Sequence, residues 1–561
     1  MHPSLPTRPT VRAFTKPDCV FCARAKRTLT GEGIDFQSYD VTADARTANA
    51  SAYFSGAYTV PQIFLGDYHV GSADDLDRLA ATGRLAALTT APHRGDLDLD
   101  AYTDDELADG AADLALSTVI PTSDGTHDPD PQTWPILHMY RRFFGFWPNT
   151  FAYLHRWPAA YKLFVYCQNA AAVQAGGQRL GRAVMSEVAY ATSRAHGCSY
   201  CMTHAVAVPG ATGPAEPDSA TGPHEAALTD LAARATRNAV TPQALAKVRD
   251  TVDQARHGDG DAQARMDALT MVVASFGFLN VFNDLVGLEI EGDWAATASA
   301  RGVTAGRHAV GDTNPRNLDH ELPSGGPTLP QLMAGYDELV GDPETYAERE
   351  LGFVPAWVRA WPAAQRRRHC HLYVELMRDR PHSRIPADLK HLMARVSAVA
   401  RDHGYLAAAE GYLAFTAAPD RSNAVTRIDR CVAAATGRAD DGGVFDDRER
   451  AALRLAWLSA QVPLVTPRRQ VQPAINHFDA DELVELAVVC AVASMLQRFA
   501  ALTGPAVEPQ VREFLARHNL SADPLVLRYP LPDGAVSDGA VSDGAVSDGA
   551  VSDGAVSDGG R

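Results

Sequence analysis

Residues 16–22 read KPDCVFC, and this stretch decides the fold of the N-terminal part of the chain. The apolar run TVRAFT precedes it at residues 10–15 and has the composition of a buried strand. The sequence ARAKRTL follows it and favours a helix, so we expect Cys19 at a helix N-terminus and Cys22 one turn inside. Backbone N–H groups and the helix dipole stabilise a thiolate there, and Lys16 adds positive charge. The pattern therefore predicts a redox-active dithiol on an α/β scaffold.

The same α/β pattern continues over residues 10–88. DFQSYDV (35–41) and TVPQIFL (59–65) are typical of strands, and ADDLDRLAATGRL (73–85) is typical of a closing helix. Together with KPDCVFC and HVGSADDL (69–76), these motifs closely resemble a dithiol glutaredoxin, which has the thioredoxin-like fold. The resemblance implies that Cys19 and Cys22 are catalytic. It also implies that Pro61 is a cis-proline that presents the backbone of Val60 to a thiol substrate.

The resemblance also implies a glutathione site. Its residues would be Lys16, Thr59, Val60, Pro61, Gly71, Asp74 and Asp75. The family usually has Gly-Gly in this turn, where the present chain has Gly71-Ser72, so we expect weaker glutathione binding or an altered thiol preference. A structural zinc pair is the alternative for Cys19 and Cys22, but no second ligand pair lies nearby in the sequence.

A second close cysteine pair lies in SRAHGCSYCMTH, residues 193–204. Gly197 is a natural helix C-cap, so we expect one helix to end there and another to begin near Cys198. Cys201 and His204 would share a face of the new helix, and Glu187 of the preceding helix can orient the histidine directly or through water. This supplies a nucleophile, a base and an orienting acid.

The pattern of Glu187, Cys198, Cys201 and His204 resembles the AhpD-like (alkylhydroperoxidase and carboxymuconolactone decarboxylase) superfamily of all-helical proteins. The resemblance implies that Cys201 attacks a peroxide, that Cys198 resolves the sulfenic acid, and that His204 and Glu187 relay protons. Tyr200 stands where the family often has a histidine, which puts the efficiency of peroxide reduction in question. A zinc site made by Cys198, Cys201, His204 and a fourth ligand is the competing interpretation. Decarboxylase or lactone chemistry fits less well, because those relatives generally lack the cysteine pair.

The helical part of the sequence contains a tandem duplication. GFWPNTFAYLHRWPAA begins at Gly145 and GFVPAWVRAWPAA begins at Gly352, and we place the two repeats at residues 135–330 and 345–520. In the second repeat Tyr405, Ala408, Gly411 and Ala394 replace Cys198, Cys201, His204 and Glu187. We therefore expect a multidomain chain with an α/β thioredoxin-like domain at residues 10–90 and an all-α AhpD-like tandem repeat whose second copy is degenerate.

Two further segments are acidic. Residues 91–134 are rich in Asp and read as a solvated linker with at most one short helix, and the DGAVS repeats of residues 533–561 read as a disordered tail. The net charge of −17 argues against nucleic acid and against an anionic membrane surface as partners. The sequence has no apolar run of membrane-span length, no signal-peptide pattern and no disulfide-scaffold spacing, so we expect a cytoplasmic location.

These observations predict a thiol-dependent peroxidase that reduces hydroperoxides at Cys198 and Cys201. Its fused glutaredoxin would reduce the resulting disulfide with glutathione or a similar thiol, and no bound cofactor or metal is expected. A disulfide oxidoreductase acting on protein partners and a non-enzymatic redox sensor are the alternatives. Relatives of the helical part form homo-oligomers, so we also expect self-association. The scattered Cys167, Cys370, Cys431 and Cys490 lie in apolar helical contexts and are expected in the core.

Overall fold

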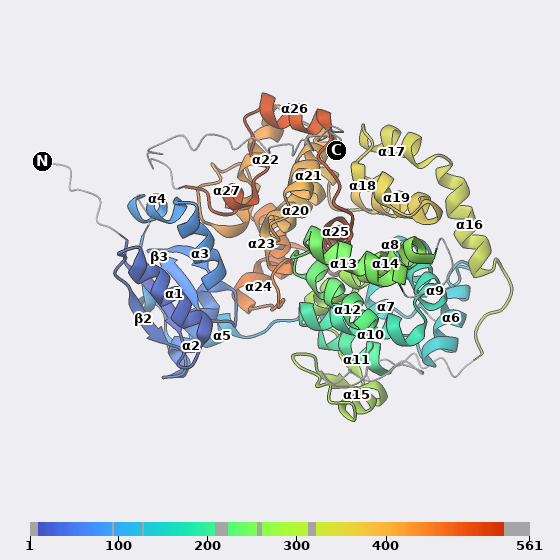
Figure 1. Cartoon of the computed structure of the whole chain (residues 1–561), viewed down its shortest axis with the longest axis horizontal. Helices are drawn as coiled ribbons and strands as arrows, with labels where there is room; N and C mark the ends of the chain where they lie inside the picture. Colours follow the sequence, from blue (N-terminus) through green and yellow to red (C-terminus); the bar gives the residue numbers. More distant parts are fainter. Residues whose placement is uncertain are drawn as a thin grey trace, which may run out of the picture.

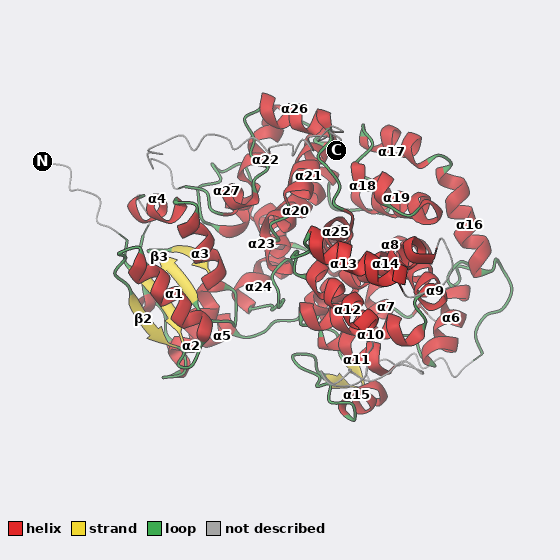
Figure 2. Ribbon diagram, viewed as in Figure 1, coloured by secondary structure: helices red, strands yellow, loops and turns green. Residues whose placement is uncertain are grey.

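A computed structural model of the chain describes residues 9–91, 95–125, 128–207, 223–254, 261–311 and 321–531. The predicted tail at residues 533–561 lies outside the described residues. Figure 1 shows an α/β unit at the N-terminal end of the chain and a helical body beside it. Figure 2 shows the four longer strands gathered in the α/β unit, while helices make up nearly all of the body. The predicted order of an α/β unit followed by a largely helical remainder is therefore confirmed.

The α/β unit contains a four-stranded sheet with the order β2-β1-β3-β4. β1 (Val11–Thr15) pairs in parallel with β2 (Gln37–Asp40) and antiparallel with β3 (Gln62–Leu65), which pairs antiparallel with β4 (Tyr68–Gly71). The helices of this unit are α1 (Val20–Gly31), α2 (Ala45–Ser55), α3 (Ala73–Ala81) and α4 (Arg84–Thr90). The sequence interpretation missed β4 and α2, and it merged α3 with α4, which Gly83 separates with a φ of 70°.

Alternating strand residues give the sheet two apolar faces. Val11 and Ala13 of β1 belong to one buried cluster with α1 and α3, whereas Phe14 belongs to a second cluster with Ala50 of α2 and Leu107. This is the period of two that a strand covered on both faces requires. The sheet is therefore sandwiched, and the dithiol lies where β1 gives way to α1.

The acidic segment after the α/β unit is more ordered than expected. It contains two short 3-10 turns and a helix: η1 (Leu99–Ala101), α5 (Asp104–Ala111) and η2 (Leu116–Thr118). Leu107 is buried against the sheet, and Leu116 is buried in the core of the helical body. The description of this segment as a solvated linker was therefore wrong, because its few leucines are anchors between the two parts.

The helical body has two halves joined through one core. The first contains α6 (Trp134–Phe144), α7 (Asn149–Leu154), α8 (Pro158–Leu163), η4 (Phe164–Asn169), α9 (Ala170–Arg179), α10 (Arg182–His196), α11 (Ser199–Ala207), α12 (Pro223–Thr236), α13 (Pro242–Gln254), α14 (Asp261–Val286), β5 (Ile290–Glu291), α15 (Gly292–Ser299) and β6 (Val310–Gly311). The second contains α16 (Leu329–Val340), α17 (Pro343–Leu351), α18 (Ala356–Ala360), α19 (Ala363–Met377), α20 (Ala387–Ala400), α21 (Gly404–Ala417), α22 (Arg421–Thr436), α23 (Asp447–Ser459), α24 (Arg468–His477), α25 (Ala480–Thr503), α26 (Pro509–Arg517) and α27 (Pro524–Arg528).

The two long apolar helices, α14 and α25, pack against each other at the centre of this body. Residues Ala262–Val286 and Ala480–Thr503 are long and apolar enough to cross a membrane by length and composition, but 89% of the apolar window of each is buried inside the fold. A helix that is apolar on all sides is explained by burial on all sides. Tyr405, Ala408 and Ala394, which replace Cys198, Cys201 and Glu187, are buried in the same core.

The C-terminal segment returns to the N-terminal domain. Tyr529 follows α27, is fully buried, and belongs to the same cluster as Val11 and Leu79 of the α/β unit. The Tyr68 hydroxyl donates to the carbonyl of Pro530 at 3.2 Å, and Arg84 Nε donates to the carbonyl of Tyr529 at 2.7 Å. The α/β unit is therefore completed by residues from the far end of the described chain.

Candidate functional site

The first dithiol lies at the start of α1. Cys19 is the N-cap of the helix, and the backbone N–H of Cys22 donates to Cys19 Sγ at 3.1 Å. The two cysteines are joined in a disulfide, with Cys22 buried and Cys19 partly exposed. The Val60–Pro61 peptide bond is cis, and the carbonyl of Val60 lies 3.9 Å from Cys19 Sγ. This geometry leaves the outer sulfur open to attack and stabilises its thiolate once it is reduced.

The predicted glutathione residues are divided between two surroundings. Thr59, Gly71, Asp74 and Asp75 line a cavity of about 820 Å³, whereas Lys16 is exposed beside the dithiol. Val60 and Pro61 sit against the dithiol through the cis peptide.

Asp75 is already engaged by protein groups. Its Oδ2 accepts from the Ser72 amide at 2.9 Å and from the Ser72 hydroxyl at 2.7 Å, and its Oδ1 lies 3.2 Å from Arg528 Nη2. Burial alone would raise the pKa of Asp75, but Arg528 and Ser72 hold it well below the ordinary carboxyl range. Ser72, where the family usually has glycine, therefore caps α3 with its own side chain.

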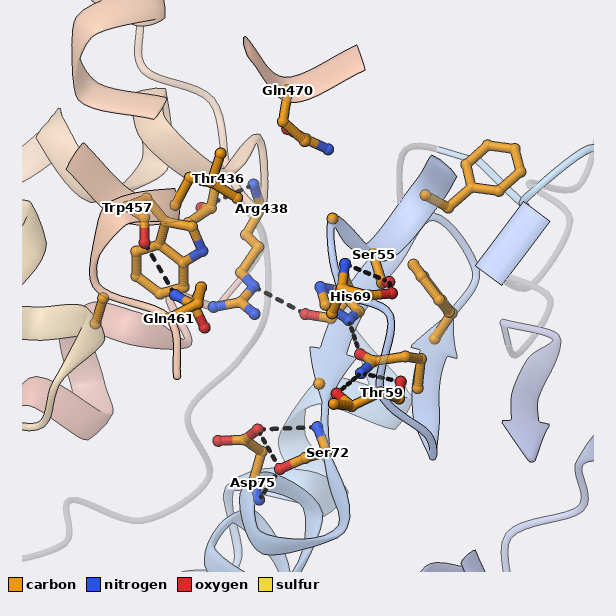
Figure 3. A pocket seen from close by; sticks show the side chains of 18 of the residues that line it. Ser55, Thr59, His69, Ser72, Asp75, Thr436, Arg438, Trp457, Gln461 and Gln470 are labelled. Carbon is orange, nitrogen blue, oxygen red and sulfur yellow. Dashed lines mark hydrogen bonds between the residues drawn. The ribbon is translucent and has the colours of Figure 1, made fainter. Parts of the chain in front are cut away.

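The cavity lies between the N-terminal domain and the second half of the helical body. Figure 3 shows Arg438 of the helical body extending to the carbonyl of His69 in β4, with Trp457 and Gln461 beside it. His69 Nε2 and Gln62 Oε1 are 2.8 Å apart, so the buried ring donates to the amide oxygen. Burial, and then the charge of Arg438, lowers the pKa of His69 to about 3, so the ring is neutral at physiological pH.

The second dithiol lies at the junction of α10 and α11. Gly197 ends α10 with a φ of 97°, and the chain enters α11 directly after Cys198. The Cys201 amide donates to Cys198 Sγ at 3.3 Å, which repeats the arrangement of the first dithiol. Both cysteines are buried, and Asn283 Nδ2 of α14 donates to Cys201 Sγ at 3.2 Å. The prediction that one helix ends at Gly197 and a second begins near Cys198 is confirmed.

His204 contacts an acid that the sequence analysis did not name. His204 Nε2 lies 2.8 Å from Glu291 Oε2, whereas the role of Glu187 as an orienting acid stays a prediction. Glu291 comes from β5, after α14, which no count of helical spacing around the dithiol could reveal. Burial alone would raise the pKa of Glu291, but His204 and the amide of Asn149 lower it. Glu291 is thus a carboxylate that holds the His204 ring.

The second half keeps a counterpart of this acid. Glu291 Oε1 accepts from the Tyr200 hydroxyl at 3.0 Å and from the Asn149 amide at 2.7 Å. Glu508 Oε1 likewise accepts from the Tyr405 hydroxyl at 2.9 Å and from the Ala356 amide. Asn149 and Ala356 both follow the proline of the two GFxP motifs. The second repeat therefore lacks counterparts of the Cys198–Cys201 pair and of His204 but keeps this carboxylate.

Cys198 faces a buried set of charged groups. Asp284 Oδ1 lies 2.8 Å from His308 Nε2, and Asp284 Oδ2 lies 3.4 Å from His196 Nε2. Arg498 of α25 donates to His196 Nδ1 at 3.0 Å. Burial lowers the pKa of His196 to about 4, so this ring is neutral and donates towards Asp284. Burial, then contact with Cys201 and Asp284, raises the pKa of the Cys198 thiol, so Cys198 is held in its protonated form.

Cys198, Asp284 and His308 are also close enough to hold a metal ion, since their ligand atoms all lie within 4.8 Å of one another. His308 Nδ1, however, lies 2.6 Å from the carbonyl of Leu288, and its Nε2 faces Asp284 Oδ1. Both ring nitrogens are therefore already engaged by oxygen atoms, which leaves neither free for a metal ion. The geometry favours a His308–Asp284 hydrogen bond over a metal centre.

Cys201 and His204 line a second cavity of about 1000 Å³. Most of its walls are apolar, and they come mainly from α6, α7, α9, α10 and α14, with side chains such as Tyr140, Phe151 and Leu279. No Asp or Glu lines it among the described residues. Cys198 is absent from its described lining, so a molecule in this cavity meets Cys201 first.

The remaining cysteines are structural. Cys167, Cys370, Cys431 and Cys490 are all buried in the helical core, as predicted. Burial raises the pKa of the Cys370 and Cys490 thiols to about 12, so they are not nucleophiles at physiological pH.

A thioredoxin-like sheet with a Cys-x-x-Cys pair at a helix N-terminus defines the N-terminal domain as a thiol–disulfide oxidoreductase. Comparisons with known proteins give the family. The glutaredoxin family model matches residues 11–70. A glutaredoxin of Pseudomonas aeruginosa is 40% identical over 83 residues, which are 15% of this chain and 99% of that protein. The chain therefore belongs to the glutaredoxin family through its N-terminal domain.

Other similar proteins cover one part of the chain each. The hybrid peroxiredoxin hyPrx5 of Haemophilus influenzae is 39% identical over 81 residues, which are 14% of this chain and only 33% of that relative's length. The solution structure of a glutaredoxin from Brucella melitensis is 38% identical, covers 15% of this chain and 90% of its own, and has a TM-score of 0.14. The debrominase Bmp8 is 18% identical, covers 33% of this chain and 93% of its own, and has a TM-score of 0.28.

Proposed function

We propose that the protein is a thiol-dependent peroxidase that reduces organic hydroperoxides at Cys201 and is reset by its own glutaredoxin domain. The observation that carries the proposal is the position of Cys201 in the wall of the apolar cavity, beside a histidine held by a buried carboxylate. A nucleophile, a base and an orienting acid are the groups that cleavage of an O–O bond needs. The resemblance of the helical body to a duplicated AhpD-like protein points to the same chemistry.

In the first step the Cys201 sulfur attacks the terminal oxygen of the hydroperoxide. The O–O bond breaks, the thiol proton passes through His204 to the leaving alkoxide, and the products are an alcohol and Cys201 sulfenic acid. In the second step the Cys198 sulfur attacks the Cys201 sulfur. The S–O bond breaks, a disulfide forms, and the leaving hydroxide takes the Cys198 thiol proton and departs as water.

The two electrons then come from the Cys19–Cys22 dithiol, whose oxidised form is reduced by two molecules of glutathione or a similar thiol. The match of the N-terminal domain to a protein named a hybrid peroxiredoxin supports the pairing of a glutaredoxin with a peroxide-reducing partner. Under this proposal the protein works in the cytoplasm, where such thiols are kept reduced, and has no resident metal.

The test is peroxide consumption by the full chain. With cumene hydroperoxide, glutathione, glutathione reductase and NADPH, the wild-type protein should turn over continuously. Cys201→Ser should abolish turnover, and Cys198→Ser should allow one turnover and leave a sulfenic acid that dimedone labels. Cys490→Ser, in the core of α25, is the control and should keep full turnover. Undiminished turnover by Cys201→Ser would refute the proposal.

A further inference from the structure

Two different parts of the chain form the walls of the cavity of about 820 Å³ between the N-terminal domain and the helical body. One wall is the glutaredoxin face, with the Thr59 loop, β4 and the start of α3. The other wall is formed mainly by the second half of the helical body, from the end of α20 to the start of α24. Figure 3 shows the side chains of the two walls facing each other across the gap.

Arginines dominate the helical wall. We call them the arginine wall: Arg237, Arg401, Arg438, Arg454 and Arg469. None of the five forms an ion pair with a carboxylate among the residues that the structure describes. The contacts of Arg401 and Arg438 are carbonyl oxygens, such as that of Ala460 for Arg401 Nη1 and that of His69 for Arg438 Nε. Arg469 lies over the Tyr53 ring at 4.0 Å, and its Nη1 donates to the Tyr53 carbonyl at 3.2 Å.

The carboxylates on the glutaredoxin wall do not neutralise these cations. Asp75 pairs with Arg528 and Arg78, Asp74 pairs with Arg24, and Asp96 pairs with Arg12. Each of these three acids is therefore matched by a base outside the arginine wall. Asp402 also lines the cavity and pairs with Arg78 and Arg528. With Asp67 and Asp98, six aspartates line the cavity against seven arginines, so its net positive charge is small and comes from the arginine wall.

Burial opposes the charge of two of these arginines. Burial lowers the pKa of Arg401 to about 10, and burial lowers the pKa of Arg454, with the neighbouring Arg469 adding to the effect. Desolvated like charges disfavour one another, and an anion bound between them relieves that strain. The arrangement is thus suited to an anion held between the arginines.

We propose that the arginine wall binds the carboxylates of the low-molecular-weight thiol that reduces the Cys19–Cys22 disulfide, so that the second helical repeat forms half of the thiol site. The inference deepens the proposed function but rests only on its thiol-dependent glutaredoxin step, not on peroxide reduction. Glutathione carries two carboxylates, and guanidinium groups pair with carboxylates through two parallel hydrogen bonds. A cavity of about 820 Å³ is of the size that holds a molecule of this class.

The same inference accounts for the turn at the start of α3, where a backbone amide of the glutaredoxin face is not available to an anion. Ser72 and Asp75 form a capping box, so the Ser72 amide at the start of α3 is already used. A Cβ at Gly71 would lie 2.6 Å from Asp75 Oδ2, which shows how tightly the carboxylate fills this turn. In this proposal the arginines opposite the turn bind the anion, and the backbone amide of the turn does not.

Binding is measured first, with the full chain and S-methylglutathione, which keeps both carboxylates and cannot be oxidised. Arg454→Gln should weaken binding about 10-fold in isothermal titration calorimetry, because one charged hydrogen-bonding partner is lost. Arg450→Gln is the matched control, since Arg450 lies one turn earlier on α23 and pairs with Asp441 outside the cavity. It should change binding less than 2-fold. No binding by the wild type, or equal binding by Arg454→Gln, overturns the inference.

Thiol specificity is measured second, with 2-hydroxyethyl disulfide as the acceptor, so that the helical dithiol is not required. The wild type should use glutathione at least about 10-fold better than glutathione diethyl ester, which lacks both carboxylates, and added salt should reduce the difference. Arg454→Gln should lose most of this preference while Arg450→Gln keeps it. A preference that persists unchanged in Arg454→Gln contradicts the inference even if peroxide reduction is intact. A different result would contradict only the proposed function. In that result the protein does not reduce peroxide, the wild type prefers glutathione over its diethyl ester, and Arg454→Gln has lost this preference.

Discussion

His204 Nε2 and Glu291 Oε2 lie 2.8 Å apart although 87 residues separate them in the sequence. If this contact positions the base of the reaction, Glu291→Gln should lower peroxide turnover by about 10²-fold. The neutral amide neither orients the His204 ring in the same way nor supplies a negative charge beside it. Turnover is measured with cumene hydroperoxide and glutathione between pH 5 and 9.

Glu508→Gln is the control for this variant. Glu508 makes the same contacts to a tyrosine hydroxyl and a backbone amide in the second repeat, where no dithiol is present, so turnover should be unchanged. Glu187→Gln tests the other acid. A large loss there, with full activity in Glu291→Gln, would support the assignment that sequence spacing suggested.

The glutaredoxin dithiol should be the entry point for electrons. A Cys19→Ser, Cys22→Ser double variant should lose glutathione-driven peroxide consumption, because no thiol remains to reduce the Cys198–Cys201 disulfide. Dithiothreitol, which is small enough to act directly, should still support turnover. Glutathione-driven turnover at the wild-type rate would exclude the relay between the two dithiols.

Tyr529 should contribute strongly to the stability of the N-terminal domain. It is fully buried in the cluster of the sheet, so Tyr529→Ala should lower the free energy of unfolding of this domain by about 3–5 kcal/mol. Tyr529→Phe keeps the ring, and its cost should stay below about 1 kcal/mol. Urea unfolding of the full chain, followed by protease cleavage within residues 10–90, measures both. Equal stability of the alanine variant and the wild type would show that the segment is not part of the core.

The buried Asp75 predicts the direction of the pH dependence. Its folded-state pKa is held below the ordinary value of about 4, so the stabilisation that it provides is complete above that value. The stabilisation is lost as the pH falls through the lower folded-state pKa. Asp75→Asn should therefore be less stable than the wild type at pH 7, by about 3 kcal/mol, and the difference should shrink towards pH 3. Urea unfolding at the two pH values measures this. Asp105→Asn, an exposed acid of α5, is the control and should show no such difference.

Local patterns predicted what depends on local contacts. The strand before KPDCVFC, the cap at Cys19 and the helix end at Gly197 follow from neighbouring residues, and the structure has each of them. The cis bond at Pro61, which the structure also has, followed from the resemblance to glutaredoxins. The strand β4 was missed because it is four residues long and follows β3 after only two residues.

The contacts that the sequence did not predict are long-range ones. Glu291, Asp284 and His308 reach the second dithiol only because α14 and the β5–β6 pair bring them there, and Arg498 arrives from the other repeat. One similarity between the two repeats was not apparent from the sequence. Comparing the repeats residue by residue identified the lost cysteines, but the retained acid at Glu508 lies outside the aligned helices.

The burial of Tyr529 in the N-terminal sheet has a consequence for synthesis of the protein on the ribosome. Tyr68 and Pro530, which share a hydrogen bond, are 462 residues apart, so at 5–20 residues per second the partner appears roughly 20 to 90 s later. During that interval the nascent glutaredoxin domain has an apolar gap where the Tyr529 ring will lie. The glutaredoxin domain thus leaves the ribosome well before it can be completed, and a chain that stops before Tyr529 carries a dithiol on an unfinished scaffold.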